Sequence, residues 1–162
     1  MGPVAYFSLC LLGCLIFNPS LEGAQAGPCP RGWFSFQDEC YGYFPEQLSW
    51  ERAKARCQRF GSGAHLASIH SEEEHDAVAG FITRSQRHDD DDVWIGLYIP
   101  VRRQSWSWVD GSTVDYSAWE KQKSYYSLKG EHCAVLEEDT GFMTWDNDSC
   151  NDRNPFVCKY RP

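Results

Sequence analysis

The sequence predicts a single α+β domain in which short strands pack with two amphipathic helices and are held by disulfide bonds. Its 162 residues suit one domain. Val93–Leu97 is an apolar run between charged residues and Pro100, which is typical of a short buried strand. Two other stretches, 50–60 and 72–82, repeat apolar residues at helical spacing. Six cysteines follow residue 26, and an even number in a short secreted chain indicates disulfides.

Residues 1–26 have the features of a secretory signal peptide. Val4–Phe17 is almost entirely apolar and carries no charge, and Ala24-Gln25-Ala26 supplies the small residues that a signal peptidase reads. We therefore expect removal of residues 1–26 and a mature, secreted domain of residues 27–162. The alternative, a membrane anchor, is disfavoured because a span needs roughly 20 apolar residues. No later stretch is apolar enough to span, so we expect no membrane contact.

The mature segment is acidic. It keeps all 15 Lys and Arg and loses only Glu22 of the 23 acidic residues, so its formal charge is −7 against −8 for the whole chain. Nucleic acid is disfavoured as a partner because its phosphates would repel this charge. Cationic partners and surfaces rich in divalent metal ions are compatible with it.

The mature cysteines allow several pairings, and spacing alone does not choose among them. Cys29 and Cys40 are close enough to join an N-terminal hairpin, and Cys57 with Cys158 would close a loop of about 100 residues, worth about 4 to 5 kcal/mol in the chain-entropy model. The six positions are Cys29, Cys40, Cys57, Cys133, Cys150 and Cys158.

The first half of the domain predicts a hairpin followed by a capped helix. Strands are expected at 32–36 and 39–44 around a turn at Gln37-Asp38. Ser49 is the expected N-cap of the first helix, which Gly61–Gly63 ends. The expected buried face of this helix is formed by Trp50, Ala53, Cys57 and Phe60.

A short strand at 64–69 and a second helix follow. Ser71 is the expected N-cap, with Glu74 three residues later completing a capping box. Acidic residues in this first turn suit the positive end of the helix dipole. The expected buried side is formed by Ala77, Val78, Phe81 and Ile82.

The second half predicts further strands around a long loop. Gly96, inside the central strand, indicates close approach of another backbone or a large ring. Trp106 and Trp108 alternate with small polar residues, so both rings should lie on one side of a strand. Residues 114–130 have little periodicity and are expected to form a long surface loop, a kind of segment that is often functional. The last strands are expected at 133–136, 142–145 and 156–160.

Four features carry a resemblance to a known family: the strand 93–97, the box 106–111, Trp145 shortly before Cys150, and the intervals between the six cysteines. In this order they resemble a C-type lectin-like domain of the long form across residues 28–160. The resemblance implies two helices flanking two small antiparallel sheets, and it implies that the loop 114–130 carries the sugar and calcium site where one exists. It also implies three disulfides, Cys29–Cys40, Cys57–Cys158 and Cys133–Cys150.

A narrower resemblance is to avian eggshell-matrix lectin-like proteins of the struthiocalcin, dromaiocalcin, ansocalcin and ovocleidin type, and to the related lithostathine (Reg) group. It is carried by the acidic run before Val93 and by residues 40–44, 48–50, 65–73, 129–136 and 145–150. Members of the eggshell group are secreted into the mineralising fluid and associate with calcium carbonate. The resemblance therefore implies an extracellular-matrix protein that modulates eggshell mineralisation.

The calcium-dependent sugar site of the family is incomplete in this sequence. The family places an acid-Pro-amide triplet where this chain has Lys123-Ser124-Tyr125, so a cation replaces a required anion. Glu131 matches the later acidic ligand, and Asp146-Asn147 reverses the usual final pair. We expect weak calcium binding at most, no other cofactor, and no tight calcium-dependent sugar binding. On the alternative interpretation, Asp146 and Asn147 only shape the loop before Cys150.

Two acidic clusters are candidates for contact with calcium carbonate. Repeated carboxylates could meet a row of calcium ions, each contact weak and the sum appreciable. The alternative is a solvated surface loop, which charge runs usually form. The candidate residues are Glu72, Glu73, Glu74, Asp89, Asp90, Asp91 and Asp92.

Two residues lie in modification motifs, and no residues stand in a recognisable catalytic arrangement. Ser71 lies in a Ser-x-Glu pattern typical of phosphorylated mineral-associated proteins, and Asn147 begins a glycosylation sequon, although the acidic residue within the sequon disfavours occupancy. His65, His70 and His75 recur every five residues, a spacing that does not suit one zinc site. No nucleophile and base stand in a recognisable context, and the mature cysteines are expected to be oxidised, so we expect no enzyme activity.

Two functions remain. The first is the acidic matrix protein acting on calcium carbonate crystals. The alternative is calcium-independent binding of carbohydrate or bacterial cell wall, antimicrobial in the manner of the lithostathine group, through the aromatic and Lys-bearing loop 116–129.

Overall fold

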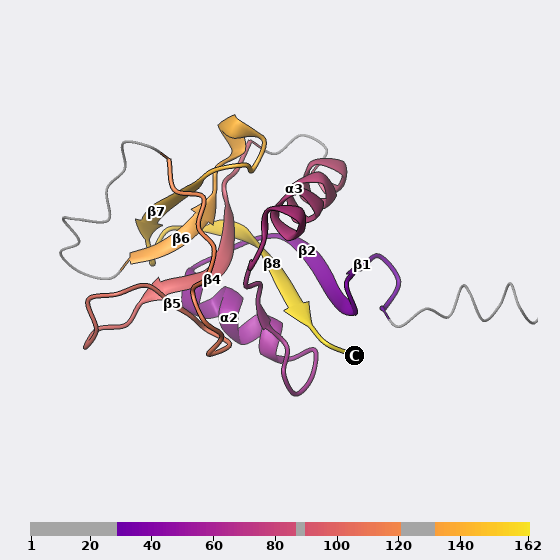
Figure 1. Ribbon diagram of the computed structural model, residues 1–162, viewed down its shortest axis with the longest axis horizontal. Helices are drawn as coiled ribbons and strands as arrows, with labels where there is room; N and C mark the ends of the chain where they lie inside the picture. The colour runs from indigo at the N-terminus through magenta and orange to yellow at the C-terminus, as the bar shows by residue number, and fades with distance from the viewer. Residues whose placement is uncertain (1–28, 87–89, 121–131) are drawn as a thin grey trace, which may run out of the picture.

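The computed structural model describes residues 29–86, 90–120 and 132–162. In these residues the chain forms one series of hydrogen-bonded strands with two helices beside it (Figure 1). The signal peptide expected at residues 1–26 lies outside this range. The helices are α2 (Trp50–Gln58) and α3 (Glu72–Ser85), and a 3-10 turn covers Glu138–Thr140. The strands are β1 (Phe34–Phe36), β2 (Glu39–Leu48), β3 (His65–Leu66), β4 (Val93–Ile99), β5 (Ser107–Trp108), β6 (His132–Leu136), β7 (Trp145–Ser149) and β8 (Asn154–Tyr160).

The strands form two antiparallel halves that meet at one point. Their order is β1-β2-β8-β4-β6-β7, with β3 paired to β8 and β5 paired to β4. Every pairing is antiparallel except that of β4 with β8, where Trp94 lies opposite Phe156 in parallel. The α+β class is thus confirmed, and the two small sheets are joined through this single pair. β8, the last strand in the sequence, lies in the middle of the sheet.

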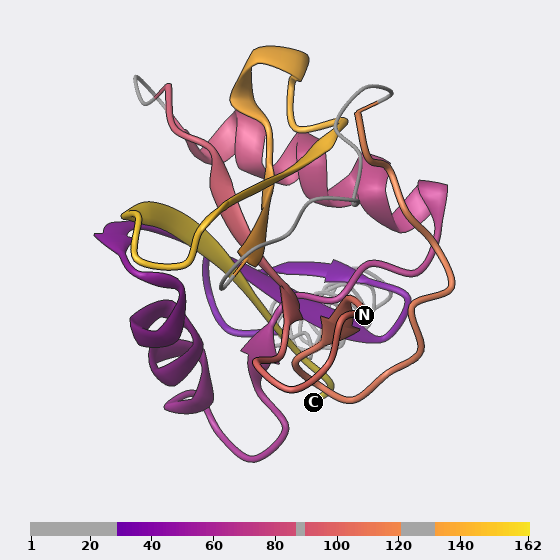
Figure 2. The ribbon, with the colours of Figure 1, turned by 90° about the vertical axis from the view of Figure 1, so that its left-hand side faces the viewer.

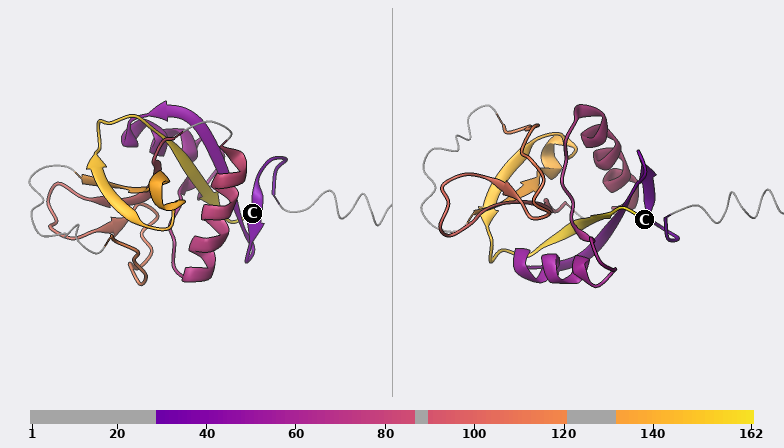
Figure 3. Two further views of the ribbon diagram at one scale, coloured as in Figure 1. Left: turned by 90° about the horizontal axis from the view of Figure 1, so that it is seen from above. Right: turned by 60° about the horizontal axis from the view of Figure 1, so that its bottom comes forward.

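The two helices lie on opposite sides of the half formed by β1, β2 and β8, which Figures 2 and 3 show from different directions. Ser49 caps α2 as expected, its hydroxyl oxygen accepting from the Arg52 N–H at 3.4 Å. The helix ends at Gln58, earlier than expected, so Phe60 is not part of its buried face. Phe60 is 43% exposed and stacks on Phe44, with ring centroids 5.0 Å apart.

Helix α3 begins with half of the expected capping box. The Ser71 hydroxyl accepts from the Glu74 N–H at 3.1 Å. The reciprocal bond is different, because the Glu74 carboxylate accepts from the N–H of His70, at 2.6 Å, and not from that of Ser71. The carboxylate therefore turns toward the preceding segment and the protein interior.

The centre of the core is β4, as the sequence predicts. Val93, Trp94, Ile95 and Leu97 are fully buried. A Cβ atom on Gly96 would lie 2.6 Å from the Leu66 carbonyl oxygen, and the Gly96 N–H donates to Ala67 at 2.9 Å. The expected close approach of a second backbone is confirmed, and only glycine fits there.

Tryptophan rings connect β5, β7 and the start of the long loop. Trp108 packs edge-on against Trp145 at 5.7 Å, and Trp106 lies 4.7 Å from Trp119. Both rings of the 106–111 box therefore join one cluster, although only Trp108 lies in the strand. A backbone bridge between Trp119 and Trp145 holds the first part of the loop against β7.

Two strand predictions were wrong in extent. The stretch 64–69 forms a strand only at His65–Leu66, and the strand expected at 142–145 begins at Trp145 and runs on to Ser149. Phe142 has a φ of 65°, in the left-handed region, because the chain there is leaving the 3-10 turn. The three disulfides among the described residues are those that the resemblance implied: Cys29–Cys40, Cys57–Cys158 and Cys133–Cys150. In the described part of the chain, no helix combines the length and the apolar character that a membrane crossing requires.

Candidate functional site

Three carboxylates form an exposed group at the start of α3, which we call the helix patch: Glu72, Glu73 and Asp76. Glu72 and Glu73 are on the surface as predicted, whereas Asp76 was missed because it stands outside the Glu-Glu-Glu run. Among the described residues, none of the three has an ion-pair partner. Two of them lie in the first turn, where the helix dipole stabilises negative charge.

Glu74 was predicted to be a surface acid, and that prediction was wrong. Its side chain is buried, with 6% of the residue exposed, and Oε2 lies 2.7 Å from Lys159 Nζ. The Tyr41 hydroxyl also donates to this carboxylate. Burial, followed by the bond to Glu74 and its negative charge, raises the pKa of Tyr41 well above its ordinary value. A buried charge needs a partner of opposite sign, and Lys159 supplies it.

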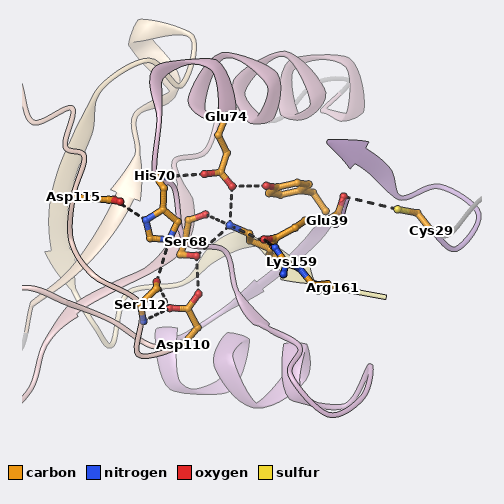
Figure 4. A network of polar contacts seen from close by, with 11 residues as sticks. Cys29, Glu39, Ser68, His70, Glu74, Asp110, Ser112, Asp115, Lys159 and Arg161 are labelled. Carbon is orange, nitrogen blue, oxygen red and sulfur yellow. Dashed lines mark hydrogen bonds and ion pairs between the residues drawn. The ribbon is translucent and has the colours of Figure 1, made fainter. Parts of the chain in front are cut away.

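The ammonium group of Lys159 is the centre of a polar network that joins three parts of the fold (Figure 4). It donates to the Ser68 carbonyl oxygen at 3.0 Å and lies 3.2 Å from the Ser68 hydroxyl. That hydroxyl donates to Asp110 at 2.7 Å. Burial would raise the pKa of Asp110, but hydrogen bonds from Ser112 and Ser68, with the charge of Lys159, hold it below its ordinary value. β8, α3 and the Asp110-Gly111 turn are thereby connected.

His70 connects the start of α3 to the first residues of the long loop. Its Nδ1 lies 2.7 Å from Asp115 and its Nε2 lies 3.0 Å from the Ser112 hydroxyl (Figure 4). The hydrogen bond from His70 lowers the pKa of Asp115. The imidazole therefore bridges two points of the segment 112–115.

His75 makes a second connection, from inside the core. Its Nε2 lies 2.7 Å from the Phe142 carbonyl oxygen, which can only accept, so Nε2 carries the proton. In the neutral ring Nδ1 then accepts from the Tyr116 hydroxyl at 2.9 Å. Burial lowers the pKa of His75, which favours this neutral form. Tyr116 is thus held at the base of the long loop.

These contacts account for two of the three regularly spaced histidines as structural anchors. Within residues 29–86, 90–120 and 132–162, no three His, Cys, Asp or Glu side chains are grouped so that they could hold a metal ion.

The run of four aspartates is not a row of free carboxylates. Asp89 lies outside the described residues, and Asp90 is exposed as predicted. Asp91 accepts from the Gln47 side chain at 2.8 Å, and Asp92 accepts from the backbone N–H of Glu138 at 2.8 Å. Asp91 and Asp92 are partly buried and bonded to other segments, so the four residues do not present a continuous row of free carboxylates.

A second group of acids lies around β7, and we call it the strand patch: Asp92, Asp146, Asp148 and Asp152. Burial first, and then the negative charges of Asp92, Asp146 and Asp152, raise the pKa of Asp148 to about 6. The pKa of an acid is raised in this way when burial and neighbouring negative charges both disfavour its charged form. Of the three acids on or after β7, only Asp146 stands at a position that the family resemblance marks as a ligand.

The remaining sugar-site positions divide between two parts of the chain. Lys123, Ser124, Tyr125 and Glu131 lie outside the described residues. Asn147 lies in β7, and its side-chain nitrogen is 2.9 Å from His132 Nδ1. Because that nitrogen is the one that glycosylation would modify, the contact works against modification of Asn147. Ser71, whose hydroxyl oxygen is engaged as the α3 cap, stays a predicted phosphorylation site.

Comparison with known proteins gives consistent relatives. The family described as Lectin C-type domain matches residues 46–160. Dromaiocalcin-1 of Dromaius novaehollandiae is 48% identical over 144 residues, which cover 88% of this chain and 98% of the relative. Among solved structures, human lithostathine has a TM-score of 0.76 at 34% identity and covers 83% of this chain and 100% of its own. Ovocleidin-17, described as a major protein of the Gallus gallus eggshell calcified layer, has a TM-score of 0.73 at 35% identity, over 83% of this chain and 99% of its own.

Proposed function

Because the chain belongs to the C-type lectin domain family, we propose that it is a secreted matrix protein that binds calcium carbonate and modulates crystal growth in the eggshell. The proposal is supported by similarity to dromaiocalcin-1 and to ovocleidin-17. The chain acts in this proposal as a binding module, without a catalytic step.

The observation that carries the proposal is the helix patch. Glu72, Glu73 and Asp76 present three exposed carboxylates from one rigid helix, with no cation of the described chain to neutralise them. Carboxylate oxygens are the ligands that calcium prefers. Carboxylates fixed on one element meet a crystal face together, so that weak contacts add up.

The strand patch supports the same function. Burial, and then repulsion by the neighbouring carboxylates, raises the pKa of Asp148, and calcium ions of a mineral face would relieve that repulsion. Asp146, a member of this patch, also belongs to the Asp146-Asn147 pair, which stands in reversed order where the family's calcium site has its final ligand pair. We propose that Asp146 contacts calcium ions of the mineral surface weakly.

The experiment compares calcite crystals grown with the secreted wild-type protein and with three charge-matched triple variants. The helix-patch variant carries Glu72→Gln, Glu73→Gln and Asp76→Asn, and the strand-patch variant carries Asp146→Asn, Asp148→Asn and Asp152→Asn. The control removes three exposed acids from elsewhere on the chain, through Asp38→Asn, Glu46→Gln and Glu51→Gln.

We expect wild type and control to alter crystal faces and to adsorb to calcite equally. The helix-patch variant should need several times more protein for the same effect, and the strand-patch variant should show a smaller loss. Equal behaviour of the helix-patch variant and the control would contradict the assignment, because net charge alone would then explain adsorption.

The loop-based alternative receives less support from the described residues. Tyr116 is bonded to His75, and Trp119 packs on Trp106 and Trp145. Aromatic rings held in this way are not a free platform for a sugar. The rest of the predicted binding segment, beyond residue 120, lies outside the described residues.

A further inference from the structure

A polar pocket of about 450 Å³ lies where the start of α2 meets the turn before β8. Its lining residues are Gln47, Leu48, Ser49, Arg52, Asn151 and Arg153. The volume falls in the range of about 300 to 1,000 Å³ that is usual for small-molecule sites. Asp146 and Asn147 do not line it, and neither does any residue of the helix patch or the strand patch. The pocket is therefore separate from the sites described above.

The two segments that form this pocket are fixed to each other through the backbone. The Trp50 N–H donates to the Cys150 carbonyl oxygen at 3.0 Å, and Leu48 lies opposite Asn154 in the pairing of β2 with β8. Cys150 is in addition held by its disulfide to β6. The backbone positions of the two arginines, one from each segment, are thus fixed relative to each other before a ligand arrives.

The pocket carries two positive charges in an otherwise acidic chain. In the described part of the chain neither Arg52 nor Arg153 has an ion-pair partner. The two other cations of α2, Lys54 and Arg56, each form an ion pair with a glutamate. No carboxylate lines the pocket. Two unpaired guanidiniums, each with a planar set of donors, match an oxyanion of two negative charges.

Neutral groups of the same pocket add hydrogen-bond donors. The Ser49 hydroxyl oxygen accepts from the Arg52 N–H as the α2 cap, which leaves the hydroxyl hydrogen for a ligand. The side-chain amide of Asn151 makes no hydrogen bond within the described residues. Gln47 differs, because its side-chain nitrogen already donates to Asp91 at 2.8 Å. The guanidiniums are therefore supplemented by one hydroxyl and one amide.

The size and the composition of the pocket narrow the ligand class. None of the lining residues is aromatic, so a sugar ring or a nucleobase finds no ring to stack on. The volume is many times the roughly 30 Å³ that one water molecule occupies, which is more than an inorganic anion needs. A phosphate monoester carries nearly two negative charges at pH 7 and three acceptor oxygens. Its carbon chain would meet Leu48, the one apolar residue of the lining.

We propose that this pocket binds a phosphate monoester, the side chain of a phosphoserine in a partner protein. Arg52 and Arg153 pair with the phosphoryl oxygens, Ser49 and Asn151 donate to them, and Leu48 contacts the adjacent carbon. The proposal does not depend on mineral binding, since the pocket shares no residue with either acidic patch.

The test is an NMR titration of the full secreted chain, labelled with nitrogen-15, in EDTA and about 0.15 M sodium chloride so that long-range attraction is screened. The ligand is a blocked glycine-phosphoserine-glycine peptide. It is compared with the same peptide carrying serine or aspartate, and with orthophosphate. The side-chain Nε–H signals of Arg52 and Arg153 report binding directly.

Three single-arginine variants locate the site. Arg52→Gln and Arg153→Gln each remove one guanidinium of the pocket. Arg59→Gln removes the same charge from an exposed position at the other end of α2, which does not line the pocket. A fourth variant, Asn151→Trp, fills the pocket from an exposed position without changing charge. The spectrum of each variant without ligand checks that it is folded.

We expect wild type and Arg59→Gln to bind the phosphopeptide within about two-fold of each other, and Arg52→Gln and Arg153→Gln to bind it about ten-fold more weakly. Asn151→Trp should abolish the shifts. The aspartate peptide should bind about ten-fold more weakly than the phosphopeptide, and the serine peptide should not bind. Orthophosphate should bind several times more weakly, because it makes no contact with Leu48.

Four results would overturn the proposal. Equal weakening by Arg59→Gln and the two pocket variants would mean unspecific attraction to α2. Equal binding of the aspartate peptide would mean a carboxylate site, and equal binding of orthophosphate would mean a simple anion site. Absence of shifts at Arg52 and Arg153, or shifts that persist in Asn151→Trp, would exclude the pocket. Each is separate from the crystal-growth experiment, which uses acidic variants.

Discussion

Lys159 Nζ lies 2.7 Å from the Glu74 carboxylate, with 8% of each side chain exposed. The pair joins β8 to the first turn of α3 across 85 residues of sequence. A buried ion pair of this kind is strongly destabilising to break from one side, because the remaining charge stays in the interior.

Removing one partner should therefore cost more than the removal of any surface charge. We expect Lys159→Met to lower the free energy of unfolding by about 3 kcal/mol in urea denaturation. Adding Glu74→Gln to it should restore part of that loss. Arg161→Gln, which breaks an exposed contact with Glu39, is the control and should change stability by less than about 0.5 kcal/mol. A Lys159→Met variant as stable as this control would disprove the structural role.

Asp148 should weaken the fold at neutral pH. Its pKa is raised to about 6, so the folded state holds the proton more tightly than the unfolded state does. The stability that this carboxyl contributes is present below its ordinary pKa of about 4 and is lost as the pH rises to about 6. We expect Asp148→Asn to stabilise the protein by about 1 kcal/mol at pH 7, after allowance for solvent screening, and by nothing near pH 3.5. A stabilisation that is equal at both pH values would contradict this account.

His75 should make the free energy of unfolding depend on pH in the opposite sense, so that acidification destabilises the protein. Its pKa is lowered, so its contribution is complete above the ordinary pKa of about 6.5 and is lost as the pH falls below it. His75→Gln, which cannot titrate, should flatten the dependence of unfolding free energy on pH between about 7 and 5. An unchanged slope would show that other groups cause it.

The Tyr116 hydroxyl provides a separate measure of the same anchor. Tyr116→Phe removes only the donor to His75 Nδ1 and should cost about 1 kcal/mol at pH 7. Ser117, exposed on the next residue, offers a control through Ser117→Ala, which should be neutral. A neutral Tyr116→Phe would mean that the loop is held at its base by other contacts.

Two glycines should respond to alanine with opposite signs. In Gly96→Ala the new Cβ would lie 2.6 Å from the Leu66 carbonyl oxygen, which the sheet holds in place, so we expect a loss of about 2 kcal/mol. In Gly80→Ala, within α3, the nearest atom is the flexible tip of Arg84 at 3.3 Å, so helix propensity should give a gain of up to about 1 kcal/mol. Thermal unfolding of the two variants and the wild type under the same conditions tests both predictions.

Local patterns in the sequence predicted local structure well. Ser49 and Ser71 cap helices because their hydroxyls reach N–H groups three residues away, a relationship contained in the sequence itself. Gly96 was likewise marked by its place inside an apolar run. The end of α2 was missed because Phe60 has the right spacing but packs on Phe44 after the helix has stopped.

The candidate site was predicted less well, because burial of an acid depends on distant partners. Glu72, Glu73 and Glu74 look alike in sequence, and only the arrival of Lys159 distinguishes the third. Asp92 faces a backbone N–H that lies 46 residues further on. No periodicity signals such encounters.

The central position of β8 determines when the other strands of the sheet can pair during biosynthesis. β2, β3 and β4 all pair with β8 (Asn154–Tyr160), and β8 is synthesised after all three of them. The strands synthesised earlier therefore have unpaired edges until β8 is available, and exposed strand edges are prone to aggregation. We expect folding to be completed only after synthesis of β8 and to depend on chaperones, and a premature stop codon before Asn154 to yield a product that does not fold.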